Sequence, residues 1–302
     1  MSTAPAASAE TIALPLATIA SEIDDLFESL LLIPADRSAK LVKAMRYAAV
    51  GGGKRFRPLL VHAAAELFAV PRSQSLRAGL AVECIHVHSL IHDDLPCMDD
   101  DSLRRGKPTV HVAFDEATAV LAGDSLLAVA FEILSDERTH PDADRRCELV
   151  RELAHAAGAW GMAGGQMLDL TPLEANDLEA VMRLERLKTG ALIGWSVEAG
   201  AILGSASREA RMSLRGYAQN LGLAFQIADD LLDAHGDEQA VGKRLRKDAA
   251  QGKQTFVTLL GKTRAQQQAA MLVEQAIGHL RSFDGRAGML ERIARFAIVR
   301  DY

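Results

Sequence analysis

Apolar residues in this chain recur at steps of three and four, and no window alternates apolar and polar residues as a half-buried strand would. Prolines fall between the periodic segments, where helices are expected to start or stop. This pattern predicts an all-α fold with helices over residues 16–32, 38–50, 58–69, 74–95, 113–135, 144–168, 174–203, 207–233, 255–279 and 286–298. Two of these, 74–95 and 207–233, are apolar around most of their circumference, which is typical of central helices.

The sequence predicts one domain, because no Ser-, Gly- or Pro-rich linker divides the 302 residues. We expect residues 1–12 to form a loose tail and residues 237–253 to form a polar loop. The acidic balance, with a net charge of −6, argues against general binding of nucleic acid. Three cysteines without metal-site spacing favour a reduced, cytoplasmic setting. No secretory signal is expected, and no apolar run approaches the roughly 18 residues of a membrane span.

Five aspartates fall inside nine residues in the stretch HDDLPCMDDDSLRRG, and two arginines follow at once. Asp93 and Asp99 are six residues apart and would lie about 240° apart on a continuous helix. Pro96 disfavours that continuation, so a break there is expected to bring Asp99 back toward Asp93. His86 lies one heptad before Asp93 and shares its face.

A second acidic cluster occurs in LAFQIADDLLDA, where Asp229 and Asp233 lie about 40° apart on one helix face. A solvated face is the ordinary explanation of such a run, but these neighbours are too apolar for an exposed face. Two carboxylates about 4 Å apart repel by roughly 4 kcal/mol at an effective dielectric of about 20. The two clusters therefore predict bound cations.

The ligand chemistry favours magnesium. A calcium loop starting at Asp93 would need Gly and Glu where Met98 and Arg104 stand, and zinc would need a tight spacing that the histidines do not offer. Sparse carboxylate ligands suit Mg²⁺, whose coordination is completed by water and substrate phosphates. We therefore expect a diphosphate ligand.

Three basic groups accompany the acidic clusters and are candidates for holding phosphates. Guanidinium groups bind phosphate oxygens bidentately, and the glycines of GGGKRFRP allow a ligand to approach the backbone closely. No P-loop string is present. Taken alone, each group is more often a plain surface patch. The candidates are Arg104 and Arg105 after the first cluster, Lys54 and Arg57 in the glycine segment, and Lys243 and Lys253 after the second cluster.

Polar residues also interrupt otherwise apolar helices. Lys188, Thr189 and Gln226 are candidate site residues of this kind, although each alone is more often a satisfied polar group in a core. Gln166 and Asp169 share one face of GGQMLDL and are weaker candidates for outer contacts to a metal.

From about Tyr47 to the C-terminus, the chain resembles the trans-isoprenyl diphosphate synthases of the bacterial farnesyl and geranylgeranyl type. The matching segments, in order, are GGGKRFRP, the two-arginine acidic segment, LKTGALI, FQIADDLLD and GKRLRKDAAQGKQT. The resemblance implies an isoprenoid-synthase fold, a helical bundle around a deep cavity, as one polyprenyl synthase domain that forms a homodimer.

The resemblance also assigns roles. It implies three Mg²⁺ ions bound by Asp93, Asp99 and Asp229, with Asp94 and Asp233 in support. It implies that the allylic diphosphate is held by Arg104, Lys188, Lys243 and Lys253, and isopentenyl diphosphate by Lys54, Arg57, His86 and Arg105. It places the oxygens of Thr189 and Gln226, with the Lys188 carbonyl, beside the developing carbocation.

Product length is expected to depend on His88 and Ser89, which lie about 6–7 Å deeper than Asp93 along the same helix. Farnesyl synthases of this type often carry an aromatic residue at the first position, and geranylgeranyl synthases a smaller one. An imidazole is bulky enough to stop a chain early, which favours the 15-carbon product, farnesyl diphosphate. A simple packing role for His88 is the alternative.

Several other functions fit the sequence less well. The nearest is a geranylgeranyl diphosphate synthase, which carries the same chemistry to 20 carbons. A terpene cyclase or a head-to-head synthase does not need the isopentenyl site that GGGKRFRP and Arg105 suggest. A non-catalytic partner subunit tends to lose one acidic motif, whereas this chain keeps both. A metal buffer or scaffold does not need the matched basic groups.

Overall fold

A computed structural model describes residues 4–171, 177–235 and 254–299. Lys243 and Lys253 lie outside the described residues. The elements are α1 (Ala4–Leu30), α2 (Ala39–Ala49), α3 (Phe56–Glu66), α4 (Arg72–Asp93), β1 (Leu103–Arg104), β2 (Lys107–Pro108), α5 (Val110–Ala113), α6 (Glu116–Ser135), α7 (Ala143–Ala157), α8 (Met162–Asp169), α9 (Leu178–Glu185), η1 (Arg186–Gly190), α10 (Ala191–Leu203), α11 (Arg208–His235), α14 (Phe256–Leu260), α15 (Lys262–His279), η2 (Arg281–Phe283) and α16 (Gly288–Ala297).

The predicted all-α fold is confirmed, with helices in every predicted segment and differences at their breaks. The helix expected over 174–203 is divided by η1, a π-helical turn. The helix expected over 255–279 is divided at Gly261, whose φ of 75° is a backbone conformation that glycine adopts readily. No strand was predicted, yet β1 and β2 form a hairpin with two residues in each strand. α1 begins at Ala4, inside the segment expected to be an irregular tail.

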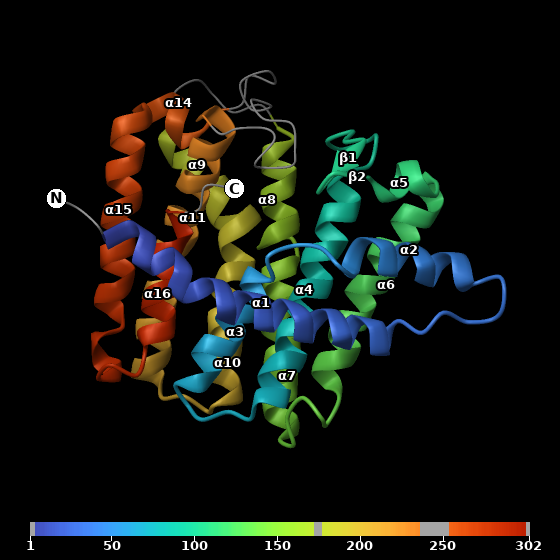
Figure 1. Cartoon of the computed structure of the whole chain (residues 1–302), viewed down its shortest axis with the longest axis horizontal. Coiled ribbons are helices and arrows are strands. Elements are labelled where there is room, and N and C mark those ends of the chain that lie inside the picture. The colour runs from blue at the N-terminus through green and yellow to red at the C-terminus, as the bar shows by residue number, and fades with distance from the viewer. Residues whose placement is uncertain (1–3, 172–176, 236–253, 300–302) are drawn as a thin grey trace.

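The centre of the bundle contains α3, α4 and α10, and Figure 1 shows the β1–β2 hairpin at the same end of the bundle as α9 and α14. A Cβ on Gly200 of α10 would lie 2.6 Å from the Ala64 Cβ, so this glycine allows α10 to approach α3 closely. α4 is buried continuously over residues 78–85, which confirms its central place. The same prediction for 207–233 is wrong for its first half, where Met212 and Arg215 are exposed.

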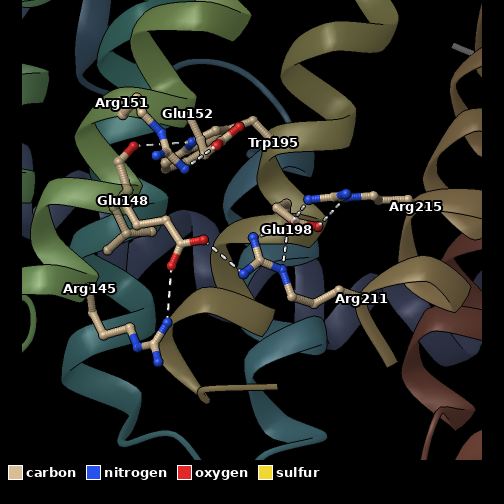
Figure 2. A network of polar contacts seen from close by, with 9 residues as sticks. Arg145, Glu148, Arg151, Glu152, Trp195, Glu198, Arg211 and Arg215 are labelled. Carbon is tan, nitrogen blue, oxygen red and sulfur yellow. Dashed lines mark hydrogen bonds and ion pairs between the residues drawn. The ribbon is translucent and has the colours of Figure 1, made fainter. Parts of the chain in front are cut away.

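An ion-pair network joins α7, α10 and α11 away from the aspartate motifs (Figure 2). The Arg211 guanidinium donates to Glu148 at 2.7 Å and to Glu198 at 2.6 Å. Arg215 donates to Glu198 at 2.8 Å, and Arg145 donates to Glu148 at 3.0 Å. The partly buried Glu148 and the buried Glu198 are therefore each paired with two arginines.

α6 is rich in apolar residues, although Asp124 and Glu132 interrupt them. Its mean hydropathy of 1.7 and its 20 residues meet the length and composition of a membrane span, contrary to the expectation that no segment approaches one. In the structure, however, one face of α6 packs against α4 and contains the buried Ala119, Ala122 and Leu126. A buried helix of a globular core passes the same composition test.

Candidate active site

The first acidic cluster lies where α4 ends and the chain folds back on itself. The Asp99 N–H donates to the Asp93 carbonyl at 2.8 Å, and the Asp100 N–H donates to the Leu95 carbonyl at 3.2 Å. These bonds return Asp99 to Asp93 across the break at Pro96, so the predicted fold-back is confirmed. Because the turn is held by the backbone, the two carboxylates are brought close without a bound ion.

Asp94 is buried and forms an ion pair with Arg104 of β1. The Arg104 Nε lies 2.8 Å from both carboxylate oxygens of Asp94, and its Nη2 lies 2.6 Å from Oδ1. Such a bidentate pair fixes the plane of the guanidinium. In this structure Asp94 holds Arg104 and is the sequence neighbour of Asp93, which was predicted as a metal ligand.

Lys188 is the cation with the largest effect on Asp93. Burial raises the pKa of Asp93 to about 6, with Asp99 and Asp94 adding to the shift and Lys188 and Arg104 opposing it. Burial alone lowers the pKa of Lys188, but Asp169, Asp93 and Asp99 raise it above the ordinary value. Among the described residues, Lys188 and Arg104 therefore do not offset the effect of burial on Asp93.

The π-helical turn η1 positions Lys188, and such turns are frequent at functional sites. The Lys188 Nζ donates to Asp169 of α8 at 2.6 Å. A Cβ on Gly165 of α8 would lie 2.2 Å from the Lys188 backbone nitrogen, so only glycine allows α8 to pack this closely. Gln166 is also buried, and neither its amide oxygen nor its amide nitrogen has a hydrogen-bond partner among the described residues.

Thr189 and Gln226 come together as predicted. The Thr189 hydroxyl donates to the Gln226 Oε1 at 3.1 Å, and the Gln226 Nε2 donates to Asp230 at 3.0 Å. Asp230 is buried and also accepts from the Phe256 N–H at 2.8 Å at the start of α14. Its role is therefore to orient Gln226 and to cap a helix.

The second acidic cluster lies on the same side of the bundle as Lys188. Burial raises the pKa of Glu185 well above the ordinary value, with Asp230, Asp169 and Asp229 adding to the shift and Lys188 opposing it. The charge of Lys188 thus acts on Asp93 of the first cluster and on Glu185, whose pKa is also raised by Asp229 and Asp230 of the second cluster. Sequence reasoning did not single out Glu185, although its place three residues before Lys188 in an apolar helix was a signal.

A separate basic pocket surrounds His86 on α4. Burial lowers the pKa of His86 well below the ordinary value, and the charges of Arg57, Arg105, Arg104 and Arg55 lower it further. His86 is therefore neutral at pH 7. Four of the predicted basic and histidine residues converge here with Arg55, which makes the pocket suited to an anion.

Arg105 reaches this pocket from the β1–β2 hairpin. It occupies the turn with a φ of 53°, followed by Gly106 at 74°, and two positive φ values are typical of a type I′ turn. Cβ atoms on Gly52 and Gly53 would lie 2.8 Å and 2.5 Å from the Arg105 guanidinium. The glycine segment therefore accommodates an arginine side chain as well as leaving its backbone open.

Arg55 was not predicted as important, and it proves to anchor the glycine segment. It is almost fully buried and donates to Glu83 at 2.8 Å, to Asp24 at 2.5 Å and to the Ala49 carbonyl. Lys54 and Arg57 on either side are only partly buried. Nothing in the string KRFR distinguishes the buried arginine from the others, since its partners lie on α1 and α4.

His88 and Ser89 lie on α4 below Asp93. The His88 ring packs edge-on against His92 with centroids 4.5 Å apart, and burial lowers the pKa of His88 to about 4, so it is neutral at pH 7. The Ser89 hydroxyl donates back to the His86 carbonyl at 2.9 Å.

The fold and these residues define a class: an all-helical protein with two acidic clusters, each containing one buried aspartate, a lysine whose charge acts on Asp93 and Glu185, and a group of basic residues around His86. Asp93, Asp99, Asp229 and Asp233 offer only oxygen ligands, and burial keeps the pKa of Asp93 raised to about 6 although Lys188 and Arg104 oppose the shift. Both features fit Mg²⁺.

Comparisons with known proteins support this class. The family model for polyprenyl synthetase matches residues 38–287. The chain is 45% identical to the farnesyl diphosphate synthase of Escherichia coli over 271 residues, 88% of this chain and 91% of that protein. It is 40% identical to a geranylgeranyl diphosphate synthase of Cyanophora paradoxa, over 89% and 90% of the two chains. A crystal structure of an FPP/GFPP synthase from Zymomonas mobilis superposes with a TM-score of 0.88 at 52% identity, covering 97% and 100% of the two chains. This chain belongs to the polyprenyl synthetase family.

Proposed function

We propose that the protein is a trans-prenyltransferase that condenses isopentenyl diphosphate with dimethylallyl or geranyl diphosphate to give farnesyl diphosphate. The observation that carries the proposal is the combined environment of Lys188, which acts on Asp93 and on Glu185 beside Asp229 and Asp230, with the arginines around His86 as a second group of positive charge. Two different anions can be held at such a site, one by metal ions and one by basic side chains.

The allylic diphosphate belongs between the acidic clusters. Asp93, Asp99 and Asp229 would hold Mg²⁺ there, with Asp233 in support, and three ions are expected when diphosphate is bound. Bound Mg²⁺ would neutralise the negative charge of the departing diphosphate. Arg104, fixed by Asp94, and Lys188, fixed by Asp169, supply further positive charge at the same place.

Isopentenyl diphosphate belongs in the His86 pocket, with Lys54, Arg57 and Arg105 on its diphosphate. The allylic C–O bond breaks with its electron pair leaving on diphosphate, and the isopentenyl double bond attacks the resulting carbocation. Loss of a proton to diphosphate completes the new double bond. The oxygens of Thr189 and Gln226 stabilise the positive charge, and the apolar core excludes water from it.

A 15-carbon product is supported by the bulk of His88, whose ring packs against His92, which in turn packs against Gly123 of α6. Geranylgeranyl diphosphate is the second candidate, because relatives named for both products match this chain at similar identity. A non-catalytic subunit is disfavoured, since the described residues include both acidic clusters with their lysine and arginine partners.

We also propose a homodimer in the cytoplasm. Apolar side chains of α5 and α6 remain exposed, namely Val112 at 52%, Val120 at 40% and Leu121 at 55%. Such a surface is suited to a second copy of the chain. Light scattering of the purified protein tests this, and a monomer would contradict it.

One assay tests the proposed reaction. The protein is incubated with Mg²⁺, isopentenyl diphosphate and either allylic starter, and the chain length of the product is measured. Farnesyl diphosphate as the main product is expected from both starters. The 20-carbon product would replace the farnesyl assignment, and the absence of any condensation would contradict the proposal as a whole.

A further inference from the structure

Two histidines and an aspartate meet at the contact between α4 and α6, outside the aspartate motifs. His88 and His92 lie four residues apart on one face of α4, and Asp124 approaches from α6. One ligand atom from each of the three lies within 4.8 Å of the other two. The sequence predicted no zinc site among the histidines. The structure brings together two histidines four residues apart and a carboxylate from another helix.

The backbone of α6 is adapted to this contact. A Cβ on Gly123 would lie 2.2 Å from the His92 Nε2, so only glycine lets the ring approach α6 this closely. The His92 Nε2 donates to the Val120 carbonyl at 3.1 Å and lies 3.8 Å from the Asp124 Oδ1, so an ion bound at this nitrogen would replace its proton and this hydrogen bond. The His88 Nδ1 is buried and has no hydrogen-bond partner among the described residues. A buried polar atom without a hydrogen-bond partner requires an explanation, and a bound ion is one.

We propose that His88, His92 and Asp124 form a site for a borderline divalent transition metal of the zinc type. Two imidazoles and one carboxylate are the protein ligands of many three-ligand zinc sites, in which water takes the fourth position. The 3.8 Å between His92 and Asp124 leaves room for an ion at about 2.0–2.2 Å from each. The ion would tie α4 to α6.

The ligand set separates this site from the magnesium site. Imidazole nitrogens select zinc, cobalt or nickel, whereas Mg²⁺ prefers the all-oxygen aspartate clusters. Tetrahedral zinc ligands lie about 3.3 Å apart, so the three residues must close slightly. The Asp124 side chain is 59% exposed and can make that movement. Asp124 is one turn from Val120 and Leu121, so the site adjoins the proposed dimer contact.

The test is cobalt titration of the full-length protein in excess Mg²⁺, which keeps the aspartate clusters occupied. We expect one equivalent of Co²⁺ with the strong visible absorption of a four- or five-coordinate nitrogen-ligated ion. His88→Phe and Asp124→Asn should each lose this equivalent, and light scattering checks that they keep the oligomeric state of the wild type. His155→Ala, which removes an exposed histidine on α7, should retain it.

A second readout does not depend on variants. Stoichiometric Zn²⁺, added in excess Mg²⁺, should raise the unfolding midpoint of the wild-type protein because it links two helices. Weak absorption typical of octahedral cobalt, an equivalent that persists in His88→Phe, or an unchanged midpoint with Zn²⁺ would each overturn the site.

Discussion

Two clusters of buried charge in this protein differ in whether the protein itself supplies the opposite charge. In the network of Figure 2, burial tends to raise the pKa of Glu148, but hydrogen bonds and charges from Arg211 and Arg145 outweigh it and the pKa is lowered. Around Lys188, burial raises the pKa of Asp93 and Glu185, and one lysine does not reverse the shift. The carboxylate pKa is thus lowered in the arginine network and raised around Lys188.

The difference separates a structural role from a binding role. A network that is balanced within the chain stabilises the packing of α7, α10 and α11 and needs no ligand. We infer that the acidic cluster around Asp93, whose pKa stays raised beside the described cations, is a site for a cation, because perturbed carboxyls of this kind gather at functional sites. Each prediction below tests one side of this contrast.

The largest effect is expected from Asp93→Asn. Removing this carboxylate should lower kcat/KM by about 10²–10³-fold, because stabilisation of the departing diphosphate is lost. Without Mg²⁺ the variant should be at least as stable as the wild type, since an uncompensated buried charge is gone. Glu148→Gln is the matched control in the balanced network: it should keep kcat/KM and lose stability. Equal loss of activity in both variants would remove the contrast.

The next effect is expected from Arg211→Ala, which leaves Glu148 and Glu198 each with one arginine. We expect a loss of about 2 kcal/mol in the free energy of unfolding, measured by urea denaturation, with kcat unchanged. Arg151→Ala removes an exposed arginine paired with Glu152 and should change stability by less than about 0.5 kcal/mol. Similar losses in both would show that the network has no special stabilising role.

The pKa of Asp93 also predicts a dependence of stability on pH. Its folded-state pKa of about 6 exceeds the ordinary value of 3.8, so the group favours folding below pH 4, and this contribution is lost as the pH rises through 6. Without metal, the wild type should therefore lose about 2 kcal/mol relative to Asp93→Asn between pH 4 and pH 7. Mg²⁺ with inorganic diphosphate should remove the loss. Parallel pH curves for the two proteins would contradict this.

A smaller effect is expected in the basic pocket. Gly53→Ala should raise KM for isopentenyl diphosphate about tenfold, equivalent to about 1.4 kcal/mol, because its Cβ would displace the Arg105 guanidinium. Gly51 has a similar positive φ of 69° with no atom near its would-be Cβ, so Gly51→Ala carries the backbone strain alone. A rise in KM of the same size in both variants would assign the effect to strain.

The smallest effect on rate is expected from His88→Ala, which changes the product and leaves the chemistry intact. Shortening this side chain deepens the site beside α4, so the product should shift toward 20 carbons, as measured by chromatography of the dephosphorylated prenols. An unchanged product distribution would remove His88 from the control of chain length.

Local features of the sequence were enough for much of this site. Pro96 fixed where α4 breaks, and the break returns Asp99 to Asp93 through backbone bonds alone. The polar residues Thr189 and Gln226 stood out because their helices are otherwise apolar, and they do meet.

What could not be predicted depends on contacts between distant segments. Arg55 is buried because Asp24 and Glu83 lie on other helices, and its neighbours Lys54 and Arg57 look the same in sequence. The π-turn that positions Lys188 follows from the packing of Gly165 against it, and the continuous helix expected over 174–203 gave no sign of it. The pairing of Asp94 with Arg104 likewise required the hairpin, whose strands are too short to show an alternating pattern.

The most direct test is anomalous diffraction from crystals grown with Mn²⁺ in place of Mg²⁺ and an unreactive allylic diphosphate analogue. We expect manganese peaks about 2.0–2.2 Å from carboxylate oxygens of both Asp93 and Asp229, with the diphosphate bridging the ions. Manganese confined to one cluster, or a diphosphate bound away from both, would contradict the conclusion that the two clusters form a single metal-dependent site.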